Sequence, residues 1–150
     1  MYRDLGVKMN ELSRFITAQK RDFETALSEI RSGRKQSHWM WYIFPQLKGL
    51  GMTSTADYYG IDGFMEAKDY LADDYLRNNL IEISGALLEL DESDPEEVMG
   101  YPDNLKLRSS MTLFYLASDD EEDRSIFKAV IDKYYGGELD HRTAKMLQGK

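Results

Sequence analysis

The chain has 150 residues, of which 42% are hydrophobic and 31% are charged, and this length and composition are typical of one soluble domain with its own core. Lysine and arginine number 19 against 27 aspartates and glutamates, and the resulting net charge of −8 argues against a general binder of nucleic acid or anionic membranes. The absence of cysteine excludes disulfides, thiolate chemistry and cysteine-based metal sites, and two histidines are too few for a histidine-rich metal site.

The N-terminal region shows no targeting signal. It lacks the apolar stretch of a signal peptide, and no apolar run in the chain approaches the length of a membrane span, so we expect a cytoplasmic protein. Residues 1–10 are expected to form a flexible N-terminal arm, and residues 11–150 a single helical domain. Over residues 11–31 apolar side chains recur at helical spacing, with a phase drift near residues 20–22 that indicates two helices or one bent helix. Gly33 is placed to end this helix.

The segment SHWMWYIFPQLKGLG, residues 37–51, contains both tryptophans and one of the two histidines. Residues 39–44 are apolar or aromatic on every side, which is typical of a buried helix. The same residues would suit a buried strand, because aromatic residues and isoleucine favour strands. We favour a short central helix, because both neighbouring segments have helical patterns, and Pro45 should end it.

Helical patterns continue to the C-terminus and cover residues 53–60, 62–71, 74–90, 104–117, 126–134 and 141–147. The polar residues suited to cap helix N-termini are Thr53 or Ser54, Asp62, Asp94, Asp103 and Asp140. The acidic stretch 89–97 lacks the glycine and terminal glutamate of a calcium-binding EF-hand loop, and we interpret it as a solvated linker. We therefore expect an all-α fold, a compact single domain of about seven or eight short helices around a central aromatic segment.

Three blocks of sequence carry a resemblance to a known family. They are residues 37–51, residues 66–71 (EAKDYL) and residues 103–114 (DNLKLRSSMTLF). In this order and spacing they resemble the bacterial family called domain of unknown function 1810, over roughly residues 11–147. The resemblance implies a small, mainly helical bacterial domain and no established reaction. Members are sometimes labelled calpastatin-like, a label that implies protease inhibition and has no support in the residues of this chain.

Three residues are candidates for catalysis: His38, Asp103 and Glu66. His38 is the only imidazole in the middle of the chain and the best candidate for a general acid or base. Alternatively, it is a histidine that caps a helix or bonds a backbone carbonyl beside buried tryptophans. A carboxylate such as Asp103 or Glu66 could stabilise positive charge that develops in a reaction. No set of metal ligands is recognised, and we expect no cofactor.

Candidates for ligand binding lie in the first and third blocks and are Trp39, Trp41, Tyr42, Gln46, Lys106, Ser109 and Ser110. The aromatic residues are first of all core residues, but one ring face could stack a base or a sugar. Asp103, Lys106 and Ser110 share a helix face and could bind a phosphate or a ribose; alternatively they form an N-cap, an ion pair and a packing residue. A buried tryptophan needs a partner for its N–H, which Gln46, Ser109 or Thr112 could supply.

The first and third blocks are expected to lie side by side, because each contains polar groups that are costly to bury without a partner. We therefore expect a small polar or nucleotide-like ligand to bind between residues 38–46 and 103–112. A hydrolytic version would be an N-glycosidase acting on an ADP-ribose-type molecule. The alternative is a non-enzymatic protein-interaction module whose aromatic motif is only core. Whether the chain is an enzyme and what its oligomeric state is stay open, and no nucleic-acid or membrane partner is expected.

Overall fold

The computed structural model describes residues 2–149 of the chain, with side chains from residue 11 onward. It is 71% helical and contains nine helices and no strand within this range, which confirms the all-α fold class. The helices are α1 (Tyr2–Arg31), α2 (Met40–Ile43), α3 (Ser54–Tyr59), α4 (Phe64–Ala72), α5 (Asp74–Glu89), α6 (Pro95–Met99), α7 (Asp103–Ala117), α8 (Glu121–Tyr135) and α9 (His141–Gln148). The count exceeds the expected seven or eight because the acidic stretch contains the short helix α6.

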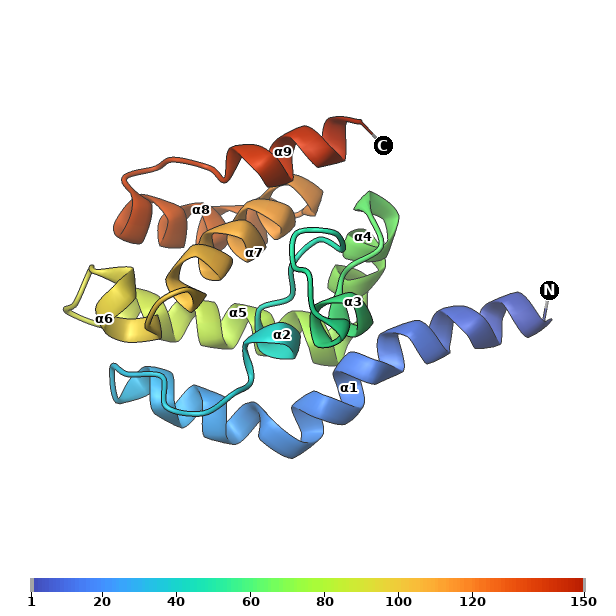
Figure 1. The fold of residues 1–150 in the computed structure, drawn as a ribbon, viewed down its shortest axis with the longest axis horizontal. Helices are drawn as coiled ribbons and strands as arrows, with labels where there is room; N and C mark the ends of the chain where they lie inside the picture. Colours follow the sequence, from blue (N-terminus) through green and yellow to red (C-terminus); the bar gives the residue numbers. More distant parts are fainter. Residues whose placement is uncertain (1, 150) are drawn as a thin grey trace.

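The helices pack in an order that leaves α2 near the middle of the molecule. In Figure 1, α1 lies along one side, α5 crosses beside it, and α7, α8 and α9 form the opposite side. Helix α5 contacts both α1 and α8, and α7 contacts α8 and α9. The single turn of α2 packs against α1 and α3. Among the described residues, no helix is both long and apolar enough to cross a membrane.

A line of buried aromatic rings connects the two sides of the domain. Phe15 of α1 meets Tyr70 of α4 with 5.3 Å between ring centroids, and Tyr70 meets Phe114 of α7 at 5.0 Å. Phe114 in turn meets Phe127 of α8 at 6.2 Å. Full burial of a phenylalanine contributes roughly 1.5–3 kcal/mol, so these contacts hold four helices in fixed relative positions.

Helix α1 is one continuous helix, so the alternative of two helices is wrong and the bent helix is the better description. Figure 1 shows its direction changing along its length. The helical backbone extends over residues 2–10, whose side chains lie outside the described residues, and the flexibility expected of this arm stays a prediction. Gly33 follows the helix with a φ of 88°, a left-handed conformation that favours glycine, and its N–H donates to Ile30 O at 2.8 Å.

The central segment forms the predicted short helix, α2, whose residues Met40, Tyr42 and Ile43 are buried. It ends before Pro45, and the N–H of Phe44 closes it by donating to Met40 O at 3.1 Å. A proline cannot continue the hydrogen-bonding pattern, which explains why the helix is a single turn. The central segment therefore contributes buried side chains to the core on one side, and the half-buried Trp41 lies on the other.

Three of the five predicted N-caps are confirmed. Thr53, Asp94 and Asp140 accept hydrogen bonds from the first turns of α3, α6 and α9, respectively. The caps predicted at Asp62 and Asp103 are wrong, because Gly63 and Pro102 occupy the N-cap positions of α4 and α7. The carboxylate of Asp103 instead forms ion pairs with lysines, and these define the candidate site.

Candidate functional site

The first and third sequence blocks meet in space, as predicted. The ammonium nitrogen of Lys106 on α7 lies over the indole ring of Trp41 on α2, 5.4 Å from its centroid. Trp41 and Lys106 are both half-buried, so this contact lies at the surface of the domain. A cation over a tryptophan face is attracted by the electron-rich ring, and the contact fixes α2 beside the start of α7.

Asp103 is the centre of a small charge cluster at the first turn of α7. Its carboxylate oxygens lie 2.9 Å from Lys35 Nζ and 3.6 Å from Lys106 Nζ. Lys35 is the more buried of the two lysines, with 8% of its side chain exposed, and it also donates to Ser37 O at 2.6 Å and lies over the Trp39 ring. Two ammonium groups against one carboxylate leave the cluster with a net positive charge in an otherwise acidic protein.

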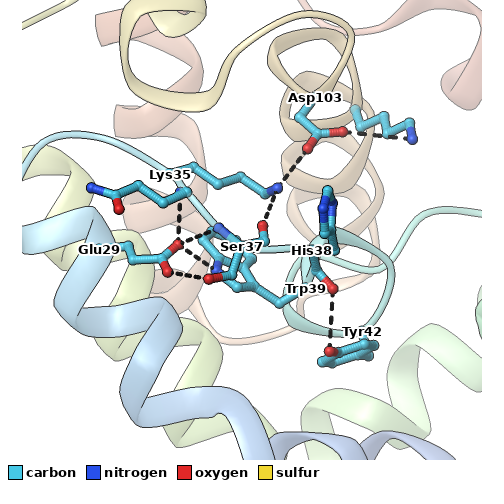
Figure 2. Close-up of polar contacts among 9 residues, drawn as sticks. Glu29, Lys35, Ser37, His38, Trp39, Tyr42 and Asp103 are labelled. Carbon is cyan, nitrogen blue, oxygen red and sulfur yellow. Dashed lines mark hydrogen bonds and ion pairs between the residues drawn. The ribbon is translucent and has the colours of Figure 1, made fainter.

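Glu29 of α1 organises the segment that carries His38. Figure 2 shows its carboxylate accepting hydrogen bonds from the backbone N–H groups of Gln36 and Ser37, from the Ser37 hydroxyl, and from Trp39 Nε1 at 2.9 Å. Burial acts to raise the pKa of Glu29, but these hydrogen bonds outweigh it and lower the pKa from 4.5 to about 2. The carboxylate is therefore ionised at neutral pH and occupied by the protein itself.

The partner of the Trp39 N–H is thus Glu29, and the partners expected from the sequence, Gln46, Ser109 and Thr112, are wrong. Sequence reasoning missed both Glu29 and Lys35. Glu29 is one charged residue among many on an amphipathic helix, and Lys35 is one of three basic residues, with Arg31 and Arg34, near the end of that helix. Neither position carries a local signal, because the partners of Glu29 lie seven to ten residues further along in an irregular segment, and Lys35 pairs with Asp103 of α7.

His38 is exposed, and Figure 2 shows its imidazole on the same side as Asp103, away from the hydrogen bonds of Glu29. Its backbone carbonyl accepts a weak hydrogen bond from the Tyr42 hydroxyl at 3.4 Å. Of the predicted residues at α2 and the start of α7, His38 is exposed, and Trp41, Gln46, Asp103 and Lys106 are half-buried. His38, Trp41, Asp103 and Lys106 together form the candidate surface.

Four of the predicted ligand-binding residues are buried and belong to the core. Trp39 is 1% exposed, and Tyr42 directs its hydroxyl to Asp22; burial and this hydrogen bond raise the pKa of Tyr42. Ser109 donates to Leu105 O at 3.3 Å, and Ser110 is fully buried with no partner for its hydroxyl within the described residues. Their burial corrects the expectation that they line the site.

Gln46 and Trp41 both line a very small hollow. They line it together with Tyr59 and Gly60, and its volume of about 10 Å³ is at most enough for a single water molecule. Gln46 is half-buried, and its backbone carbonyl accepts from the N–H of Ile61 at 2.8 Å. This hollow is too small for an organic ligand, so binding at Trp41 would use the outer surface.

Glu66 does not join the other two catalytic candidates. Its carboxylate forms an ion pair with Arg14 Nη2 at 3.1 Å and accepts from the N–H of Asp62 at 2.8 Å. It lines a separate cleft of about 520 Å³ between α1, α3 and α4, to which neither His38 nor Asp103 contributes. The predicted set of three is therefore divided between two places. Among residues 11–149, no group of three or more potential ligands is positioned to hold a metal ion.

Comparisons with known proteins agree with the resemblance carried by the three sequence blocks. A family model described as "Protein of unknown function (DUF1810)" matches residues 9–147. The chain is also similar to the conserved hypothetical protein Rv1873 from Mycobacterium tuberculosis, whose crystal structure is known at 1.38 Å. The TM-score is 0.88 with 43% sequence identity, over 92% of this chain and 96% of that chain. Comparison with curated proteins finds no match.

Proposed function

The chain belongs to the family described as protein of unknown function (DUF1810), a description that assigns no reaction, and we propose that it binds a small polar or nucleotide-like ligand. The site is the surface formed by His38, Trp41, Asp103 and Lys106. The observation that carries the proposal is the position of Lys106, whose ammonium lies over the Trp41 ring and beside Asp103. The cytoplasmic location expected from the sequence is part of this proposal.

The charges and the ring suit a ligand that combines a planar group with an anion. A base or sugar stacked on Trp41 would place an attached phosphate within reach of Lys106, whose flexible stem allows it to move from the ring to the ligand. His38 is exposed on the same side and, when protonated, would add a second positive charge. Asp103 would remain held by Lys35, and could accept a hydrogen bond from a ribose hydroxyl.

The hydrolytic version of this proposal assigns one carboxylate, Asp103, to the reacting centre. In an N-glycosidase it would stabilise the positive charge that develops on the sugar as the base leaves. Its two lysine neighbours offset its negative charge, so the geometry supports binding more strongly than hydrolysis. Chromatography of ADP-ribose and related nucleotides after incubation tests this version, and Asp103→Asn should abolish any base release.

We predict that a ligand from a panel of nucleotides, ADP-ribose and sugar phosphates raises the melting temperature. A ligand at about 100 times its Kd stabilises the fold by about 2.7 kcal/mol, which corresponds to roughly 5–10 °C for a chain of this size. Lys106→Met should weaken binding at least fivefold in calorimetry, because the anion loses its cation. Lys128→Met is the matched control, since it removes an exposed lysine of α8 that pairs with Asp132.

Two results would contradict the proposal. In the first, no compound in the panel shifts the melting temperature of the unaltered chain. In the second, Lys106→Met and Lys128→Met have the same effect on affinity, which would show that only overall charge matters. The alternative is that the aromatic motif belongs only to the core. The burial of Trp39 and Tyr42 favours this alternative for these two residues. Trp41 is the residue that separates the two hypotheses.

A further inference from the structure

Exposed hydrophobic side chains gather in one part of the chain. Within residues 11–149, six large hydrophobic side chains are exposed, and four of them lie between residues 52 and 65. They are Met52 at 93%, Tyr58 at 60%, Phe64 at 36% and Met65 at 66%. Single exposed apolar residues need no explanation, but a concentration of them marks a surface that another molecule covers.

Two of these side chains lie at hollows that together form a groove. The cleft of about 520 Å³ is lined by Tyr58 of α3, and an adjoining hollow of about 170 Å³ is lined by Met65 of α4 and Leu12 of α1. The two hollows adjoin, because Glu11, Asp62 and Glu66 line both of them. We call this feature the α1–α4 groove. It has an apolar side chain in each part and carboxylates between them.

Arg14 holds the walls of the groove in place. Its guanidinium donates to Tyr58 O at 2.7 Å, to Gly60 O at 2.8 Å and to both carboxylate oxygens of Glu66. These bonds and one to Glu11 O engage all three guanidinium nitrogens. Arg14 therefore fixes the α3–α4 connection to α1, and its own charge is offset by Glu66.

The remaining charges of the groove are mainly negative. Asp57 and Asp62 are exposed, and the ion pairs found within residues 11–149 give neither of them a cationic partner. Burial and the neighbouring Glu66 also raise the pKa of Glu11, as expected where carboxylates are crowded. Besides Arg14, the larger cleft is lined by one other cation, Lys48. The groove is thus complementary to a positively charged partner.

We propose that the α1–α4 groove binds a basic peptide segment of a partner protein, one that presents lysine or arginine side chains around an apolar residue. The apolar residue packs against Tyr58 or Met65, and the cations meet Asp57 and Asp62. A cation can also lie over the exposed Tyr58 ring. This surface is separate from the ligand surface at Trp41 and does not depend on it.

Fluorescence anisotropy with three labelled eight-residue peptides tests the proposal. The first consists of lysines around a central leucine and phenylalanine; the second has serine in place of both apolar residues; the third has glutamate in place of the lysines. We expect the first peptide to bind, the second to bind at least fivefold more weakly, and the third not to bind. Binding should weaken as salt rises, because exposed charges are screened over about 8 Å at physiological ionic strength.

Variants locate the binding. The double variant Asp57→Asn/Asp62→Asn and the single variant Met65→Ser should each weaken binding of the first peptide at least fivefold. Glu89→Gln/Asp91→Asn removes two exposed carboxylates from the acidic stretch and is the matched control, expected to bind like the unaltered chain. Equal loss in the control, or equal affinity for the first two peptides, would overturn the proposal. So would competition by spermidine at the same concentration of charge, which would indicate a small-cation site.

Discussion

At the scale of single residues, Glu29 shows how one carboxylate can order a loop. The segment between α1 and α2 has no regular secondary structure, and four of its donors converge on Glu29. A buried donor without a partner costs about 1–3 kcal/mol, so Glu29 does for this loop what a capping residue does for a helix. Because His38 lies between Ser37 and Trp39, Glu29 also positions the exposed imidazole.

We predict that Glu29→Gln destabilises the protein by roughly 1–3 kcal/mol at neutral pH, because charged hydrogen bonds are replaced by weaker ones. The pKa of Glu29 is lowered from 4.5 to about 2 in the folded protein, so its contribution to stability is fully present above pH 4.5 and is lost as the pH falls toward 2. Urea unfolding of both proteins across this range should show their stabilities converging. Parallel curves would mean that Glu29 is not responsible.

At the scale of helices and loops, local signals could be predicted and tertiary ones could not. Gly33, Thr53 and Asp140 act on groups within four residues of themselves, and their predicted roles are confirmed. The cap predicted at Asp103 is wrong, because its carboxylate pairs with Lys35, which lies far away in the sequence, between α1 and α2. No local pattern contains that information.

Helix α7 explains why only part of the candidate site was predicted. It is apolar on most sides, so the spacing of its residues does not reveal which side faces α2. Buried polar groups need partners, and this argument correctly predicted that Lys106 lies near the aromatic segment. The same argument placed Ser109 and Ser110 at the site, whereas both face the interior.

We predict measurable coupling between Lys35 and Asp103, which join the α1–α2 connection to α7. In a double-mutant cycle of Lys35→Met and Asp103→Asn, the interaction should be about 0.5–3 kcal/mol, because the pair is well shielded from solvent. The exposed pair Lys128–Asp132 on α8 is the control and should give about 0.3–0.5 kcal/mol. Additive effects at Lys35 and Asp103 would show that the ion pair does not hold these elements together.

At the scale of the whole molecule, the domain carries two candidate surfaces around one aromatic core. The line of rings from Phe15 to Phe127 fills the interior. The ligand surface lies at α2 and the start of α7, and the α1–α4 groove lies at α3 and α4. The ligand surface uses a side chain whose neighbours in sequence are core residues, because Trp41 lies between Met40 and Tyr42. Variants of the central segment therefore need separate readouts of stability and binding.

The last prediction separates the two roles of the central segment. Trp39 is 1% exposed, and Trp39→Ala should cost about 3–5 kcal/mol because it leaves a cavity and removes the N–H that bonds Glu29. His38→Ala should change stability by only about 0.5 kcal/mol, and Lys106→Ala by about 1 kcal/mol, since both side chains reach solvent. Urea unfolding measures all three, and Trp39→Phe, which retains a ring, should lie between Trp39→Ala and the unaltered chain. If His38→Ala lowers the free energy of unfolding as much as Trp39→Ala does, the imidazole contributes to the fold. The surface proposed for ligand binding would then lack His38 as an exposed side chain.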